Sequence, residues 1–288
     1  MVLHFFRNVV EEGNLRTWSP QRMYIPLPSW FKFRSAVKKL NDYVSGLVTT
    51  RWDLRVKEEM ISTDRKQDVL DKILSAIPSS EWDSGAIKQV QDEVKTFILA
   101  GHETSASMLT WSLYELLMNP KCMKIVRAEA DIIFGNRKPE NIPTRTELEA
   151  LKYTECCLRE SLRKYSVVPS VVRVASEEID LGEYNIEKGA TIMINIQGVH
   201  HDPQYWPEPL KYDPERFLSE IQPFTFMPFL DGPRMCLGQY LSILESKMVL
   251  AWLVHNYDFV LENEAEAGLK HPFMVPIIPK LGHYMRFK

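Results

Sequence analysis

The chain has 288 residues, of which 45% are hydrophobic, 25% charged and 11% aromatic, so it is long enough and apolar enough to bury a large core. The 35 Lys and Arg residues against 38 Asp and Glu give a formal net charge of −3, which argues against a nucleic-acid-binding protein, because such proteins usually carry a basic surplus. Its 4 cysteines include no C-x-x-C pair, which argues against a zinc ribbon and against a secreted disulfide scaffold.

Hydrophobic periodicity predicts a mainly helical chain after a first 35 residues that look irregular and are punctuated by prolines. Ser84 is the expected N-cap of a long helix that Asn119-Pro120 ends, and Gly135 ends the next helix. The expected helices span residues 35–60, 68–77, 84–118, 121–134, 152–165 and 239–255.

The periodicity changes after residue 165. Residues 167–174 are rich in β-branched side chains, and residues 181–196 predict a hairpin with its turn at Glu187-Lys188-Gly189. The proline-rich stretch 200–217 predicts a loop, and the last 30 residues alternate as short strands do. The expected fold class is therefore mainly α with a small β region, in one domain over residues 1–288. No run of residues is long and apolar enough to predict a membrane-spanning helix.

Cys236 stands in a glycine-flanked loop, FLDGPRMCLG, directly before the last expected helix. A helix N-terminus favours a thiolate because its free N–H groups carry a partial positive charge. Gly232 permits a tight turn, and Gly238 leaves room beside the sulfur for a large flat ligand. Arg234 offers donors that suit a carboxylate on that ligand. A buried free cysteine in a tight turn is the alternative.

Together with Phe229, these residues form the pattern F-x-x-G-x-R-x-C-x-G, which resembles the haem-thiolate signature of the cytochrome P450 family. The resemblance implies that the cofactor is haem b and that Cys236 is the axial ligand of its iron. It also implies that Phe229, Gly232, Arg234 and Gly238 surround the cofactor. The implied fold is the cytochrome P450 fold, truncated at its N-terminus.

The long expected helix carries Ala100-Gly101-His102-Glu103-Thr104, which resembles the oxygen-activation segment A-G-x-E-T of the same family. The resemblance implies that Ala100 and Gly101 leave room for dioxygen. It also implies that the Thr104 hydroxyl and the Glu103 carboxylate deliver protons. Taken without its context, a Glu-Thr pair is more often a solvated helix face.

Glu160 and Arg163 lie three residues apart on an expected helix and therefore face each other. Followed by Pro214-Glu215-Arg216-Phe217, they resemble the E-x-x-R and P-E-R-F elements of the family. The resemblance implies a buried Glu160–Arg163–Arg216 network with a structural role, which holds the loop beneath the haem.

Pro169-Ser-Val-Val-Arg173 resembles the P-x-x-x-R strand of the family, which implies that Arg173 binds a haem propionate. An exposed strand arginine is the alternative. His102, His200 and His201 are less suitable as haem ligands, because none of them stands in a glycine-flanked loop beside a cation.

The resemblance covers the C-terminal two-thirds of a eukaryotic-type member, and the segment around the cysteine is similar to the plant and algal branch that hydroxylates carotenoid rings. It implies a haem-thiolate monooxygenase that inserts one atom of dioxygen into an apolar small molecule. A reductase or a ferredoxin would supply the electrons, because the chain has no G-x-G-x-x-G fingerprint of its own. Lys121, Lys124 and Arg127 are candidates for docking that partner, with a solvated helix as the alternative.

The N-terminal third and the membrane anchor of such proteins are expected to be absent from these 288 residues. Membrane association is accordingly expected only of the full-length protein, which would be intracellular, at the endoplasmic-reticulum membrane or in a plastid. Two other functions stay open: a non-catalytic truncated remnant that binds haem poorly, and an enzyme that uses Cys236 as a nucleophile.

Overall fold

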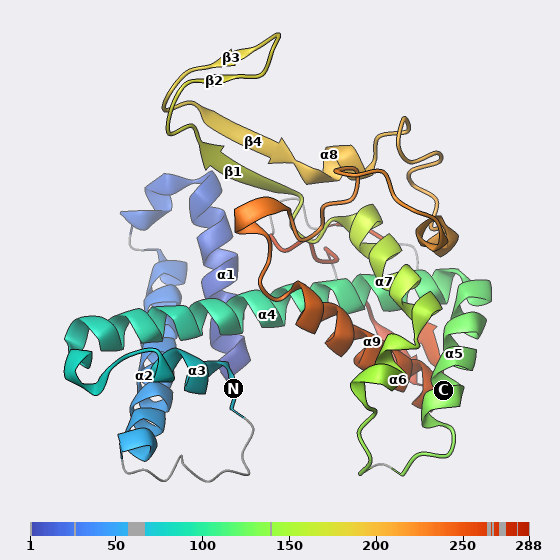
Figure 1. Ribbon diagram of the computed structural model, residues 1–288, viewed down its shortest axis with the longest axis horizontal. Coiled ribbons are helices and arrows are strands. Elements are labelled where there is room, and N and C mark those ends of the chain that lie inside the picture. Colours follow the sequence, from blue (N-terminus) through green and yellow to red (C-terminus); the bar gives the residue numbers. More distant parts are fainter. Residues whose placement is uncertain are drawn as a thin grey trace. The chain divides into compact units, whose positions relative to one another are not determined.

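The computed structural model describes residues 2–25, 27–56, 67–138, 140–263, 266, 268–270, 275–280 and 282–287. The chain divides into two compact units, Met1–His102 and Glu103–Lys288, and each contains hydrophobic clusters of its own. The division does not test whether residues 1–288 form a single haem-binding domain, so that expectation stays a prediction. The α-helices and short strands of both units are drawn in Figure 1.

The first unit is helical from its beginning, so the prediction of 35 irregular residues is wrong. Helix α1 spans Val2–Trp18, and α2 begins at Pro28. Proline is tolerated in the first turn of a helix, because the N–H groups there have no partner within the helix. Pro20 and Pro28 accordingly begin η1 and α2. Residues 57–60 of the expected helix 35–60 lie outside the described residues. The helical segments of this unit are α1 Val2–Trp18, η1 Pro20–Met23, α2 Pro28–Val56, α3 Val69–Ser75, η3 Ser79–Glu81 and the first part of α4 Ser84–Met118.

The second unit contains the end of α4 and most of the remaining elements. The predicted helices 121–134, 152–165 and 239–255 are confirmed to within one residue at each end, because proline and glycine mark several of these boundaries. The helical segments are α5 Pro120–Phe134, α6 Arg145–Glu149, α7 Lys152–Tyr165, α8 Ile196–His200, η4 Pro214–Leu218, η5 Gly232–Arg234 and α9 Gln239–Asn256.

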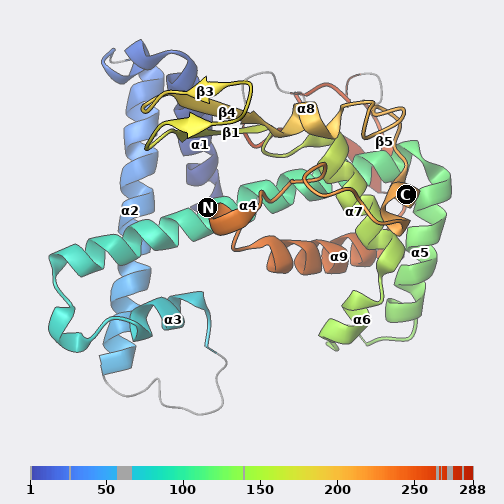
Figure 2. The same cartoon turned by 45° about the horizontal axis from the view of Figure 1, so that its top comes forward.

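The strands of this unit form three small antiparallel pairs among the described residues. Strand β1 (Ser170–Val174) pairs with β4 (Thr191–Asn195), and the hairpin of β2 (Ile179–Asp180) and β3 (Asn185–Ile186) extends from that pair (Figures 1 and 2). Strand β5 (Phe259–Leu261) pairs with β6 (Met285–Phe287) near the end of the chain, so short strands in the last 30 residues are confirmed.

The predicted hairpin turn at Glu187-Lys188-Gly189 is wrong. That segment joins β3 to β4, which pair with different strands, and the hairpin turn lies at 181–184 instead. Both turns contain a glycine with positive φ, Gly182 at 83° and Gly189 at 86°, so the local sequence signal was the same for both. The β-branched strand β1 is the better partner for β4, and this pairing places β4 beside a strand that is distant in sequence.

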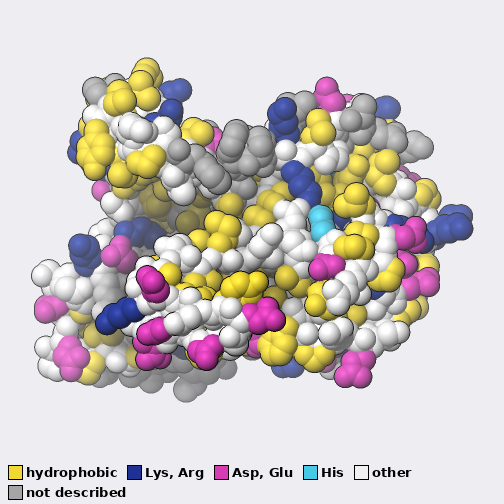
Figure 3. All heavy atoms as spheres, turned by 90° about the horizontal axis from the view of Figure 1, so that it is seen from above, with side chains coloured by type: hydrophobic (Ala, Val, Ile, Leu, Met, Phe, Trp, Pro, Cys, Tyr) yellow, Lys and Arg dark blue, Asp and Glu magenta, His cyan; other side chains and the backbone are white. Residues whose placement is uncertain are grey.

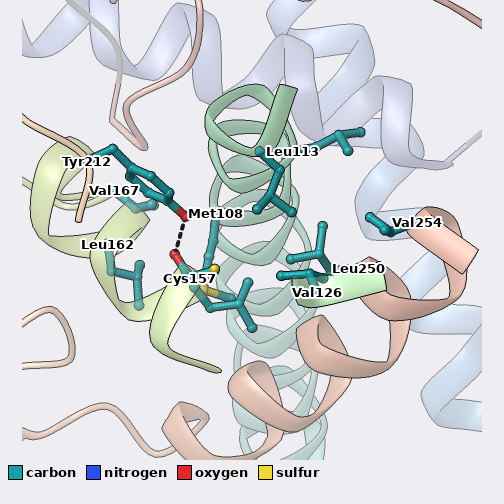
Figure 4. Packing of buried hydrophobic residues seen from close by; sticks show 11 residues of the cluster. Met108, Leu113, Val126, Cys157, Leu162, Val167, Tyr212, Leu250 and Val254 are labelled. Atoms are coloured by element: carbon teal, nitrogen blue, oxygen red, sulfur yellow. Dashed lines mark hydrogen bonds between the residues drawn. The ribbon is translucent and has the colours of Figure 1, made fainter. Parts of the chain in front are cut away.

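The core of the second unit surrounds the C-terminal half of α4. Figure 4 shows Met108 and Leu113 of α4 packed among residues of α5, α7 and α9. The Tyr212 hydroxyl donates to the Cys157 carbonyl at 2.9 Å, which ties the loop after α8 to α7. This core holds in place the two helices that flank the cysteine loop, α7 and α9.

Large hydrophobic side chains remain on the surface, among them Val174, Met193 and Leu237. On the face in Figure 3, acidic and basic side chains are interspersed with hydrophobic ones. Within the described ranges, no helix combines the length and the apolar character needed to cross a bilayer.

Candidate functional site

The loop that carries Cys236 begins at Phe229 and folds back on itself before α9. The Cys236 N–H donates to the Phe229 carbonyl at 2.9 Å, and the Met235 N–H donates to the Gly232 carbonyl at 3.0 Å. Gly232 adopts a φ of 70°, a left-handed conformation that favours glycine, and the Asp231 carboxylate accepts its N–H at 2.6 Å. The result is a tight turn that leaves Cys236 exposed.

Gly238 is the N-cap of α9, so Cys236 lies just ahead of a helix N-terminus, as the sequence predicts. A Cβ atom added to Gly238 would lie 3.8 Å from the Cys236 Sγ, which is an ordinary contact distance. Gly238 is therefore beside the sulfur, but a methyl group would fit there. The space that it leaves matters only for a ligand bound to that sulfur.

A cavity of about 160 Å³ lies against Cys236, with walls from α4, α7, β1, α8, α9 and the cysteine loop. It brings together four of the predicted site residues: Thr104, Phe229, Arg234 and Cys236. Most of the other lining side chains are apolar. Ligand pockets usually measure about 300–1,000 Å³, so a flat ligand on Cys236 would extend beyond this cavity onto the exposed part of the loop.

Ser242 also lines the cavity, although no motif in the sequence points to it. Its hydroxyl lies 3.1 Å from the Ser105 hydroxyl, so a hydrogen bond joins α9 to α4 beside Thr104. The two serines are 137 residues apart in the chain, and no local spacing pattern could have paired them.

The other predicted residues of the long helix are Ala100, Gly101 and Glu103. Glu103 precedes Thr104 on α4 and is half-buried, but it does not line the cavity. Ala100 and Gly101 belong to the first compact unit, which ends at His102, so the structure of the second unit does not test their part in the site. The roles of all three residues stay predictions.

Arg173 lies on β1 and is also absent from the cavity wall. Its Nη1 donates to the Val172 carbonyl at 2.9 Å, so the guanidinium is folded onto its own strand. Arg234, by contrast, lines the cavity and is exposed. Of the two predicted propionate-binding arginines, the structure places only Arg234 next to Cys236.

The three members of the predicted charge network are in contact. Arg163 donates from Nε and Nη2 to the two carboxylate oxygens of Glu160 at 2.7 and 2.8 Å, and both side chains are fully buried. The Arg216 Nε lies 3.5 Å from Glu160 Oε1, and the Asp213 N–H donates to the same oxygen at 3.0 Å. Because each buried charge has several partners, the network can join α7 to the segment 200–216 without leaving an unpaired ion.

Two histidines near this network have engaged rings. His200 is fully buried, with Nδ1 2.9 Å from the Ser166 hydroxyl and Nε2 accepting the Met227 N–H at 2.9 Å. The His201 Nε2 lies 2.8 Å from the Lys164 carbonyl. Burial lowers the pKa of His200 to about 3, and the nearby charge of Arg163 acts in the same direction. Both rings point to backbone or hydroxyl partners, and that neither is a haem ligand stays a prediction.

A second cavity of about 420 Å³ also has Cys236 in its wall, together with residues of α6, α7 and α9. Its charged lining groups are paired: the buried Lys247 Nζ donates to Glu155 Oε2 at 2.9 Å, and the Tyr240 hydroxyl donates to Glu149 Oε1 at 3.0 Å. Cys236 therefore lines two cavities, and the second has more charged side chains in its wall than the first.

These groups fit a haem better than a bare metal ion. Cys236 offers a single sulfur ligand, so the remaining ligands must come from the bound group itself, as the nitrogens of a porphyrin do. The apolar walls suit the faces of such a ring, and the exposed guanidinium of Arg234 suits a carboxylate at its edge.

Comparisons with known proteins agree with this arrangement. The family model described as Cytochrome P450 matches residues 2–284. The chain is 32% identical to Cytochrome P450 4V2 of Mus musculus over 88% of this chain and 50% of that protein. It is 30% identical to Protein LUTEIN DEFICIENT 5, chloroplastic, of Arabidopsis thaliana over 90% of this chain and 45% of that protein. The chain is also 30% identical to Cytochrome P450 4c21 of Blattella germanica, over 86% of this chain and 51% of that protein.

The chain thus spans about half the length of the curated relatives that it matches. The match nevertheless runs through nearly all of its own residues, including the cysteine loop and the Glu160–Arg163 pair. On this combination of sequence match and site geometry, the chain belongs to the cytochrome P450 family.

Proposed function

We propose that this chain is the haem-binding part of a monooxygenase that inserts one atom of dioxygen into an apolar small molecule, while the other atom leaves as water. The observation that carries the proposal is the placement of Cys236, exposed in a tight loop at the wall of an apolar cavity that Thr104 also lines. Membership of the cytochrome P450 family supports the same function.

Haem b, the cofactor of this family, supplies the iron chemistry of dioxygen activation when it is bound. Cys236 would hold the iron through its thiolate and donate electron density to it. Arg234 would bind a carboxylate at the edge of the ring, and Arg173 would do so after turning away from the Val172 carbonyl. The apolar residues of the cavity would exclude water from the ligand.

Thr104 is the residue that we assign to hydrogen bonding at the bound oxygen, because its side chain lines the cavity on the α4 side. Glu103, the neighbouring residue on α4, would carry protons to it from solvent. This division of roles needs Thr104 to donate at the oxygen and Glu103 to exchange protons with water.

The mainly apolar walls of the cavity support an apolar small molecule as the substrate. A carotenoid ring is one candidate, supported by the similarity to the protein named LUTEIN DEFICIENT 5. Cytochrome P450 4V2 is equally similar, so the proposal goes no further than the class of apolar substrates. The word chloroplastic in the plant relative's name supports a plastid, and the endoplasmic-reticulum membrane is the other proposed location.

An electron donor, a reductase or a ferredoxin, would complete the system. Lys121 and Lys124 are exposed on α5 and could contact it, whereas Arg127 is already paired with Asp258 at 2.7 Å. The docking role is therefore proposed for the two lysines more strongly than for Arg127.

The test is the absorption spectrum of the chain supplied with haem, reduced and exposed to carbon monoxide. A strongly red-shifted Soret band of the thiolate type is expected for the wild-type chain and should be absent from Cys236→Ser. Persistence of that band in the variant would disprove ligation by Cys236. Failure of the wild-type chain to take up haem would favour a non-catalytic remnant.

A nucleophilic cysteine enzyme is the remaining rival. It needs a histidine within hydrogen-bonding distance of the Cys236 thiol, whereas the rings of His200 and His201 are engaged with Ser166, Met227 and Lys164. Haem binding through Cys236 would exclude this rival directly, because the ligated sulfur is not available for attack on a substrate.

A further inference from the structure

His200 links three separate segments of the chain. It ends α8, and its ring centroid lies 5.3 Å from that of Phe226 with the two ring planes tilted by 30°. Its two nitrogens contact Ser166 after α7 and Met227 before the cysteine loop. Its backbone carbonyl also accepts from the Arg163 Nη1 at 2.8 Å. The residue thus stands between the Glu160–Arg163 pair and the segment that leads to Cys236.

The hydrogen bonds have only one consistent direction. The backbone N–H of Met227 can only donate, so the His200 Nε2 must be an unprotonated acceptor and the proton of a neutral ring must lie on Nδ1. The Nδ1–H then donates to the Ser166 oxygen, whose own hydrogen is directed to the Arg163 carbonyl at 3.2 Å. With this tautomer, each of the three hydrogen bonds has one donor and one acceptor.

The series continues into the cysteine loop. The Met227 carbonyl accepts the Leu230 N–H at 3.1 Å, and the Phe229 carbonyl accepts the Cys236 N–H at 2.9 Å. The backbone from Met227 to Cys236 is therefore held at its start by the ring of His200 and closed at its end by its own hydrogen bonds.

We propose that His200, as the neutral Nδ1–H tautomer, is a positioning residue for Cys236, because its Nε2 fixes the Met227 amide and thereby the register of the cysteine loop against α7. A role as mere packing is the rival explanation, since the ring is buried beside Phe226. The part of the proposal that concerns haem ligation rests on the proposed function, whereas the hydrogen bond to Met227 does not.

Two variants of the 288-residue chain separate these explanations. His200→Gln can place an amide oxygen near the position of Nε2 and keep an acceptor for Met227. His200→Asn reaches only the position of Nδ1, so it keeps a partner for Ser166 and loses Met227. Both variants remove the aromatic ring, so a packing role predicts similar damage from each.

The first readout is hydrogen exchange of the Met227 amide, which needs no haem. We expect exchange on the order of tenfold faster in His200→Asn, as the loss of one hydrogen bond implies, and close to the wild-type rate in His200→Gln. Amides in the middle of α5 serve as the folding control. A wild-type rate in His200→Asn, or equal acceleration in both variants, overturns the proposal.

The second readout is the spectrum of the reduced, carbon monoxide-bound haem complex. The share of the thiolate-type band should fall in His200→Asn and recover in His200→Gln. A wild-type chain that binds no haem but shows the expected exchange pattern would count against the proposed function and leave the role at Met227 standing. If neither variant folds, nitrogen chemical shifts of the wild-type ring decide, because an Nε2–H tautomer contradicts the proposal.

Discussion

The carboxylate of Glu160 and the guanidinium of Arg163 meet edge to edge, with donor–acceptor distances of 2.7 and 2.8 Å and no solvent exposure of either side chain. A bidentate pair of this kind is directional as well as strong. Since Arg163 also donates to the His200 carbonyl, the pair fixes α8 relative to α7.

Arg163→Ala should therefore destabilise the chain by about 3–5 kcal/mol, because it leaves the Glu160 charge buried without its main partner. Urea unfolding measures this loss. The matched control is Arg286→Ala, which removes an exposed pair with Glu262 and should cost about 0–1 kcal/mol. Equal losses in the two variants would contradict a structural role for the buried pair, as would normal haem incorporation by Arg163→Ala.

Thr104→Ala should keep haem binding but divert reducing equivalents from product into peroxide or water, because the proposed donor at the bound oxygen is gone. The measurement is the ratio of product formed to reductant consumed. Thr110→Ala is the control, since this threonine lies on the same helix, donates to the Ala106 carbonyl at 2.7 Å and does not line the cavity. Unchanged coupling in Thr104→Ala would remove Thr104 from the proposed mechanism.

The chain should lose stability in mild acid through His200. Burial lowers the pKa of this residue to about 3 from the ordinary 6.5, so between these values the unfolded chain binds a proton that the folded chain does not. The contribution is complete above pH 6.5 and is lost as the pH falls toward 3. Between about pH 8 and pH 5 the free energy of unfolding should fall by about 2 kcal/mol, because each pH unit below 6.5 removes about 1.36 kcal/mol.

Comparison of wild type with His200→Gln isolates this effect, because the glutamine does not titrate. The pKa of His201 is also lowered by burial, but His201 is present in both proteins and cancels. The difference in free energy of unfolding should change by about 2 kcal/mol over that pH range. Parallel pH profiles would mean that His200 is not buried in its neutral form.

The cysteines should differ in reactivity toward an alkylating reagent. Cys236 is exposed, whereas Cys157 is fully buried and burial raises the pKa of its thiol, so its reactive thiolate is scarce. Mass spectrometry should find Cys236 labelled in the folded chain and Cys157 labelled only after unfolding. Haem should protect Cys236, and labelling that is unaffected by bound haem would argue against ligation.

Sequence reasoning succeeded where the signal is local. Pro120 and Gly135 mark the ends of α5, and the cysteine loop could be identified from five residues within ten positions. It failed for α1, because the prolines that follow this helix suggested irregular structure although they stand at helix starts. The hairpin failed because Gly182 and Gly189 give the same turn signal, and only pairing with the distant β1 distinguishes them.

The site shows the same limit. Ser242 and His200 contact Ser105 and Met227 across 137 and 27 residues, and such contacts leave no spacing pattern in a single sequence. The Glu160–Arg163 pair was accessible because helical geometry brings residues three apart together.

The hydrogen bond between Ser105 and Ser242 has a consequence for the shape of the cavity. Two short side chains, rather than bulky ones, set the separation of α4 and α9 at the point where Thr104 and Cys236 face the same cavity. Substitution of either serine by alanine would remove this hydrogen bond between α4 and α9 and leave the other side chains of the cavity wall unchanged. The hydrogen bond between the two hydroxyls therefore helps to fix the distance between the α4 and α9 walls of the cavity.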